Sequence, residues 1–214
     1  MIKNKKQCVL KIIKILEKDL GQVKCALNFS TPFELLTAVI LSAQCRDERV
    51  NKITENLFKR YKSISDYANA DISEFENYIK SAGFFRNKAK NIVKSAKLII
   101  DMHNGVVPHA MEELLKLPGV ARKTANVVLG NAFGKAAGIA VDTHVIRIAN
   151  LLKLTKYDDP VKIEKDLMKI VPKEYWIKFS FYIQVLGRRI CKARNPNHEI
   201  CALNKICPSA LIAN

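Results

Sequence analysis

The chain has 214 residues, of which 49% are apolar, so it can bury a substantial core. Lysine and arginine outnumber aspartate and glutamate by 36 to 20, and the formal net charge of +16 favours a polyanionic partner. A generally lysine-rich proteome is the alternative explanation of this charge. No apolar run reaches the roughly 20 residues that a membrane span requires, and the basic N-terminus lacks the apolar segment of a secretory signal. We therefore expect a cytoplasmic protein whose cysteines are not paired as disulfides.

Apolar residues recur at helical spacing along almost the whole chain, and no strand pair, hairpin signal or internal repeat is evident. Thr31 and Glu34 form a predicted capping box around Pro32, and Asp159 before Pro160 indicates another helix start. The predicted fold class is therefore all-α with short connections. The expected helices cover about residues 9–20, 32–41, 50–58, 72–82, 87–103, 112–115, 121–133, 143–152, 160–171 and 175–189.

The stretch 117–125 combines a turn, a helix start and a lysine. Gly119 can adopt backbone conformations that are closed to other residues, and a helix is expected over residues 121–133. The amides of a glycine turn that leads into a helix N-terminus favour an anion such as a phosphate. Lys123 lies in the first turns of this helix. A phosphate-binding turn beside a primary amine suggests chemistry on a nucleic acid.

Lys123 and Asp142 are the two candidate catalytic residues. A lysine attacks only as the free amine, and its ordinary pKa of about 10.4 keeps it protonated unless burial or a cation such as Arg122 lowers that value. Asp142 precedes a helix and suits an N-cap, but its carboxylate could also stabilise a developing cation or assist a proton transfer. Taken singly, a solvated lysine or plain phosphate contact and a capping aspartate are the commoner roles.

Four segments together resemble the helix-hairpin-helix DNA glycosylase superfamily, and within it the endonuclease III family of bifunctional glycosylases and AP lyases. The segments are Leu41-Ser42-Ala43-Gln44, residues 83–89 (Gly-Phe-Phe-Arg-Asn-Lys-Ala), residues 117–125 (Leu-Pro-Gly-Val-Ala-Arg-Lys-Thr-Ala) and Val141-Asp142-Thr143-His144. The hairpin alone also occurs in DNA-binding proteins without catalytic activity. The resemblance extends over nearly the whole chain. It implies two helical domains, one of residues 25–135 and one of residues 1–24 with 136–214.

The resemblance implies excision of oxidised pyrimidines from duplex DNA, followed by cleavage of the strand. Lys123 matches the family nucleophile, which attacks the deoxyribose C1′, expels the damaged base and forms a Schiff base that leads to β-elimination. Asp142 matches the essential carboxylate. Adenine glycosylases of the superfamily generally lack this lysine, so Lys123 favours lyase activity. A mismatch-specific thymine glycosylase on the same scaffold and a DNA-binding protein without catalysis are the alternatives.

The resemblance also implies DNA contacts. Gln44 matches a residue that fills the gap left by an extruded nucleotide, and Phe84 matches an apolar wedge, because base flipping requires unstacking. Without the family, Gln44 would be interpreted as a solvent-facing helix end and Phe84 as a core residue. The family commonly has glycine in place of Ala121. The expected contacts to phosphates are the hairpin residues Gly119, Val120, Ala121 and Arg122 and the basic residues Arg188, Arg189, Lys192 and Arg194.

Three cysteines lie close together near the C-terminus. The family binds a 4Fe–4S cluster through cysteines spaced Cys-x6-Cys-x2-Cys-x5-Cys, and this chain keeps that spacing with histidine at the second position. The expected ligands are Cys191, His198, Cys201 and Cys207. Histidine can ligate an iron–sulfur cluster, three cysteines and a histidine also make an ordinary zinc site, and loss of the metal is a third alternative. We expect the 4Fe–4S cluster, in a monomer that binds damaged or abasic duplex DNA near the nucleoid of a prokaryotic cell.

Overall fold

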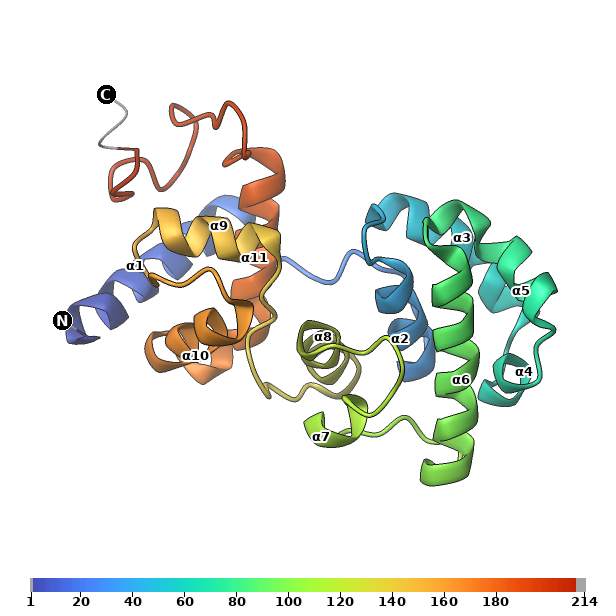
Figure 1. Ribbon diagram of the computed structural model, residues 1–214. Coiled ribbons are helices and arrows are strands. Elements are labelled where there is room, and N and C mark those ends of the chain that lie inside the picture. The colour runs from blue at the N-terminus through green and yellow to red at the C-terminus, as the bar shows by residue number, and fades with distance from the viewer. Residues whose placement is uncertain (1, 211–214) are drawn as a thin grey trace. The chain divides into compact units, whose positions relative to one another are not determined.

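The computed structural model describes residues 2–210, and these residues form helices and loops without any β-strand (Figure 1). The prediction of an all-α fold is therefore confirmed for this part of the chain. No described helix is both long and apolar enough to cross a membrane. In chain order the helices are α1 (Ile2–Leu20), α2 (Pro32–Leu41), α3 (Asp47–Arg60), α4 (Ile64–Ala68), α5 (Ile72–Ile79), the 3-10 helix η1 (Lys80–Ala82), α6 (Phe85–His103), α7 (Met111–Leu114), α8 (Arg122–Phe133), α9 (Thr143–Leu151), α10 (Pro160–Ile170), the 3-10 helix η2 (Lys173–Tyr175) and α11 (Trp176–Arg189).

Several helices start at capping residues that the sequence reveals. Thr31 accepts the amide of Glu34 at 3.1 Å, and the Glu34 carboxylate accepts the Thr31 amide at 3.2 Å, so the capping box before α2 is confirmed. Asp159 caps α10 by accepting a backbone amide at 2.8 Å. Helix α4 was not predicted, although Ser63 and Asp66 form a second capping box at its start. A short helix of this kind shows too few turns for its apolar period to be recognised.

The described chain divides into two compact units. One unit is the continuous segment Cys25–Ala137. The other consists of the chain up to Lys24 together with the chain from Gly138 onward. Each unit has its own buried apolar core, so each is held together by its own packing.

In the continuous unit, α2 is the central element. Its residues are buried from Leu35 to Leu41, and it packs against α3, α6 and α8. Helix α8 is buried from Thr124 to Gly130 and also contacts α7. Because most of α8 is buried among its neighbours, these neighbours hold the helix and its N-terminal end in place.

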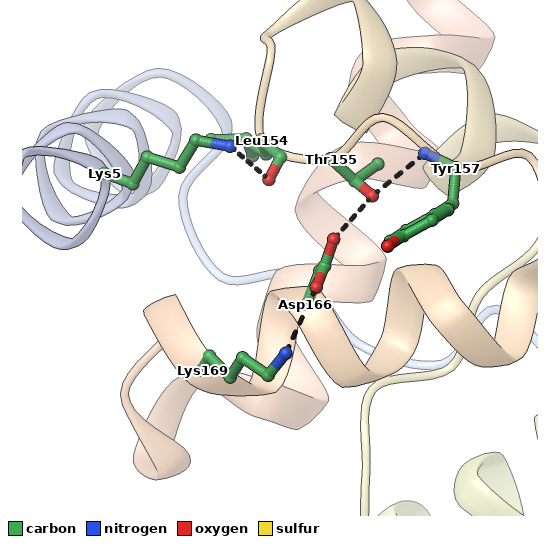
Figure 2. A network of polar contacts seen from close by, with 6 residues as sticks. All are labelled: Lys5, Leu154, Thr155, Tyr157, Asp166 and Lys169. Atoms are coloured by element: carbon green, nitrogen blue, oxygen red, sulfur yellow. Dashed lines mark hydrogen bonds and ion pairs between the residues drawn. The ribbon is translucent and has the colours of Figure 1, made fainter. Parts of the chain in front are cut away.

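In the discontinuous unit, α1 packs against α10 and α11, and α9 packs against the same two helices. The α1 core residues are Val9, Ile12, Ile13 and Leu16. Figure 2 shows how polar contacts tie the loop after α9 to its neighbours. Lys5 donates to the Leu154 carbonyl at 3.1 Å, and the Thr155 hydroxyl donates to Asp166 at 3.0 Å. Asp166 also pairs with Lys169 within α10 at 3.4 Å. The bonds of Lys5 and Thr155 therefore connect this loop to α1 and to α10.

Candidate functional site

The hairpin between α7 and α8 is held closely against α6. Gly119 has a φ of +78°, and a Cβ atom at this residue would lie 2.9 Å from Asn91 Nδ2 and 3.2 Å from Asn91 Cβ. Glycine alone fits both the conformation and the space. The Pro118 carbonyl accepts the hydroxyl of Ser95 at 3.1 Å. Asn91 and Ser95 were not predicted, because a contact to a hairpin backbone leaves no signal in the sequence of α6.

The hairpin leads into α8 without a capping side chain. The Val120 amide donates to the Leu117 carbonyl at 3.1 Å and closes the turn. Ala121 is the N-cap residue, with an extended backbone and no side-chain hydrogen bond to the first turn. The first turn contains Arg122 and no acidic residue. A helix N-terminus carries a partial positive charge, so this end of α8 is suited to an anion. The Val120 amide already donates to the turn, so an anion bound here would accept hydrogen bonds from the neighbouring backbone amides instead.

Lys123 is the second residue of α8, and its side chain is half-buried. The positive charge of Lys123 acts on the Cys25 thiol, which belongs to the same unit. Burial raises the pKa of the Cys25 thiol, and the positive charge of Lys123 acts in the opposite direction. The lysine therefore extends from a largely buried helix into a partly enclosed environment.

Asp142 is the N-cap of α9, as its place in the sequence predicts. Its Oδ1 atom accepts the amides of His144 and Val145, both at 2.9 Å, and its backbone is extended. Both capping bonds end on the same oxygen. The cap fixes the orientation of the carboxylate without using Oδ2. Capping and a chemical role are therefore compatible at this residue.

Gln44 and Phe84 share an uncommon backbone conformation. Gln44 has a φ of +53° and Phe84 a φ of +48°, a region that residues with a side chain rarely adopt. Both residues are exposed, and 69% of the Phe84 surface is accessible. The interpretation of Phe84 as a core residue is therefore wrong. Strained backbone of this kind concentrates at functional sites, because the surrounding structure must hold it in place.

Arg147 of α9 fastens the end of α11, and it was not predicted from the sequence. Its Nη2 atom donates to the carbonyls of Gly187 at 3.2 Å and Cys191 at 2.7 Å. Packing is close here as well, because a Cβ atom on Gly187 would lie 2.8 Å from His144 Nδ1. Burial lowers the pKa of His144, and the charge of Arg147 lowers it further against the opposing effect of Asp142. This contact anchors the start of the C-terminal tail.

The basic residues around this anchor are all exposed. They comprise Arg188 and Arg189 in the last turn of α11 and Lys192 and Arg194 in the loop that follows. Four cations on one short segment make a favourable surface for phosphates.

The cysteines of the tail lie near one another. Cys191, Cys201 and Cys207 are half-buried and pack against the core of the discontinuous unit. Burial raises the pKa of the Cys191 thiol, Arg147 opposes this effect, and the charges of Cys201 and Cys207 raise the pKa further. Within residues 2–210, however, no three His, Cys, Asp or Glu side chains are arranged to hold a metal ion. The described part of the structure therefore does not assemble the four expected ligands.

Comparisons with known proteins agree with one another. A model of the HhH-GPD superfamily of base-excision DNA repair proteins matches residues 37–173. Endonuclease III of Synechocystis sp. is 53% identical over 207 residues, which cover 97% of this chain and 94% of that protein. Endonuclease III of Bacillus subtilis is 49% identical over 86% of this chain and 84% of that protein.

Two solved structures are also similar over almost the whole chain. A trapped covalent intermediate of endonuclease III with DNA matches with a TM-score of 0.91 and 44% identity, covering 97% of this chain and 98% of that one. A thermostable thymine-DNA glycosylase matches with a TM-score of 0.84 and 25% identity, covering 99% of this chain and 100% of that one.

Proposed function

Because the chain belongs to the HhH-GPD superfamily of base-excision DNA repair proteins, and within it to the endonuclease III family, we propose that Lys123 and Asp142 carry out its chemistry. As a member of this family the protein is a DNA glycosylase with AP lyase activity, and its partner is duplex DNA. The observation that carries the proposal is the place of Lys123 in the first turn of α8, directly after a glycine turn suited to a phosphate. We propose oxidised pyrimidines as the damaged bases.

In the proposed reaction, the lone pair of the Lys123 amine forms a bond to the deoxyribose C1′. The glycosidic bond breaks, and the damaged base leaves with its electron pair and takes up a proton. Ring opening then gives a Schiff base between Lys123 and the sugar. Loss of a proton from C2′ and departure of the 3′ phosphate complete the β-elimination, and hydrolysis releases Lys123. The rigid setting of α8 supports this role, because a nucleophile must be held in line with one carbon atom.

Asp142 has the complementary role in this proposal. A carboxylate near the sugar stabilises the positive charge that develops there as the base departs, and it can accept and return protons. The two amide bonds to Oδ1 support the assignment, because they orient the carboxylate.

The remaining DNA contacts follow the same scheme. Gln44 would fill the gap left by the extruded nucleotide, and Phe84 would wedge between bases, which its exposure supports. The phosphate contacts would come from the hairpin residues Gly119, Val120, Ala121 and Arg122 and from Arg188, Arg189, Lys192 and Arg194. These phosphate contacts set affinity and register and do not select the base.

We propose that the C-terminal tail binds a 4Fe–4S cluster. The chemistry of the donors fits, because three half-buried thiols lie near one another on an apolar core. Cys191, Cys201 and Cys207 would be thiolate ligands and His198 the fourth ligand, with binding of the cluster bringing the four side chains together. The bound cluster would fix the loop of Lys192 and Arg194, so its contribution would be to hold two cations in place for DNA.

Borohydride reduction tests the nucleophile, because it converts a Schiff base into a stable covalent bond. With a thymine-glycol duplex we expect a trapped protein–DNA adduct, and we expect Lys123→Ala to abolish it. Lys97→Ala, which removes an exposed lysine of α6, is the matched control and should trap as well as the unchanged protein. An adduct that survives Lys123→Ala would disprove the assignment.

The similarity to a thymine-DNA glycosylase favours thymine in a G·T mismatch as a second candidate substrate. Single-turnover excision is therefore measured on a thymine-glycol duplex and on a G·T duplex. We expect faster excision of thymine glycol, and faster excision from the G·T duplex would identify the mismatched thymine as the preferred base.

Two substitutions at Asp142 separate its cap from its chemistry. Asparagine caps helices as well as aspartate, so Asp142→Asn should leave the free energy of unfolding within about 0.5 kcal/mol while excision falls about 10²–10⁴-fold. Asp142→Ala should lose activity to the same extent and about 1 kcal/mol of stability as well. Denaturant unfolding and single-turnover kinetics measure the two effects. Full activity in Asp142→Asn would contradict a catalytic role for the carboxylate.

The absorption spectrum tests the metal. Freshly purified protein should be brown, with a broad absorption band at about 400 nm from sulfur-to-iron charge transfer. The variant Cys201→Ala should lose both this band and the bound iron. Metal analysis of the same samples separates the alternatives, since zinc gives a colourless protein. Cys8→Ala, outside the tail, should keep the full band. A colourless, iron-free protein purified without oxygen would refute the cluster.

A further inference from the structure

Lys88 of α6 is a buried cation that the reaction itself does not use. Only 5% of its surface is exposed. Its ammonium group donates to three backbone carbonyls, those of Leu41 at 2.8 Å, Ala43 at 2.7 Å and Ala82 at 2.7 Å. An ammonium group has three N–H bonds, so every donor is directed at an acceptor. Burial lowers the pKa of Lys88, which shows that the interior disfavours its charge.

The three carbonyls belong to two segments that are far apart in sequence. Leu41 is the last residue of α2, and Ala43 directly precedes Gln44. Ala82 is the last residue of η1 and lies two residues before Phe84. The last carbonyls of a helix have no partner within that helix and attract a cation. One ammonium group therefore joins the two turns from which Gln44 and Phe84 project.

The backbone between these carbonyls and the exposed side chains is strained. Gln44 and Phe84 both have left-handed backbone, and Gly83 between Ala82 and Phe84 has a φ of +64° and a ψ of 144°. Such conformations persist only where the surrounding structure holds them. The Lys88 bonds are placed where this restraint is needed, one residue before Gln44 and two before Phe84. A neutral apolar side chain could fill the same space but could not bind three carbonyls at once.

We propose that Lys88 is a positioning residue that sets Gln44 and Phe84 as one rigid pair for insertion into the DNA. It would act through the backbone of the two turns and would not touch the DNA. The proposal rests on the proposed role of Gln44 and Phe84 in base flipping. The further claim is that the positions of Gln44 and Phe84 are coupled, because the Lys88 ammonium group binds the backbone of both turns.

The test compares Lys88→Met with Lys90→Met, a control that removes an exposed lysine of the same helix. Single-turnover excision is measured on a thymine-glycol duplex and on the same strand with the damaged base in an unpaired bubble. Lys88→Met should excise at least about 10-fold more slowly from the duplex and within about twofold of normal from the bubble, because the pair is needed only where a base must be unstacked. Lys90→Met should match the unchanged protein on both. Equal losses on duplex and bubble would show a general structural defect and overturn the proposal.

A double-mutant cycle shows whether Lys88 acts through the pair. The variant Gln44→Ala with Phe84→Ala should be slow on the duplex, and adding Lys88→Met should slow it by less than about twofold more. If the two effects multiply, Lys88 does not act through the pair. If Gln44→Ala with Phe84→Ala excises normally, the base-flipping role of these residues fails instead.

A further measurement applies if Lys88→Met does not fold, which thermal unfolding would show. In the unchanged background, Gln44→Ala and Phe84→Ala should lose less together than the product of their single effects, because one anchor makes them a unit. Independent effects of the two substitutions would then overturn the proposal.

Discussion

The hairpin backbone at Gly119 lies so close to Asn91 of α6 that a single added carbon atom would be 2.9 Å from the amide nitrogen. This approach, together with the bond from Ser95 to the Pro118 carbonyl, fixes where the hairpin ends and α8 begins. Helix α8 is then buried from Thr124 to Gly130. The backbone position of Lys123 is therefore set by packing on two sides, by α6 through the turn and by α2 through the helix.

The N-terminal end of α8 lacks the side chains that usually stabilise the start of a helix. Its first turn contains Arg122 and Lys123, no acidic residue and no capping side chain, although cations are unfavourable at a helix N-terminus by about 0.3–1 kcal/mol each. A bound phosphate would reverse that balance, since it supplies the missing negative charge. By contrast α2, α4 and α9 all start with side-chain caps. The unfavourable arrangement at the start of α8 thus coincides with the surface proposed to meet DNA, and α6, which follows Phe84, also starts without a side-chain cap or an acidic residue in its first turn.

The sequence predicts those features that depend on nearby residues. The all-α class follows from apolar spacing, and the caps at Thr31, Asp142 and Asp159 follow from side chains that bond to amides two or three residues away. Lys88 and Arg147 could not be predicted in this way, because each binds two carbonyls that are 40 to 47 residues distant, and a carbonyl carries no mark in the sequence. Likewise, Gln44 and Phe84 have left-handed backbone without being glycine, which only tertiary contacts can impose.

The order of synthesis gives the discontinuous unit a particular difficulty. Helix α1 leaves the ribosome before its partners, because its buried residues Val9, Ile12, Ile13 and Leu16 pack against helices that are made only after residue 138. At a synthesis rate of roughly 5–20 residues per second, this apolar face stays without its partner helices for on the order of ten seconds. The unit Cys25–Ala137 is complete much earlier and can fold while α1 is still unpaired. During that interval the nascent chain combines a complete unit of residues 25–137 with an exposed apolar face on α1.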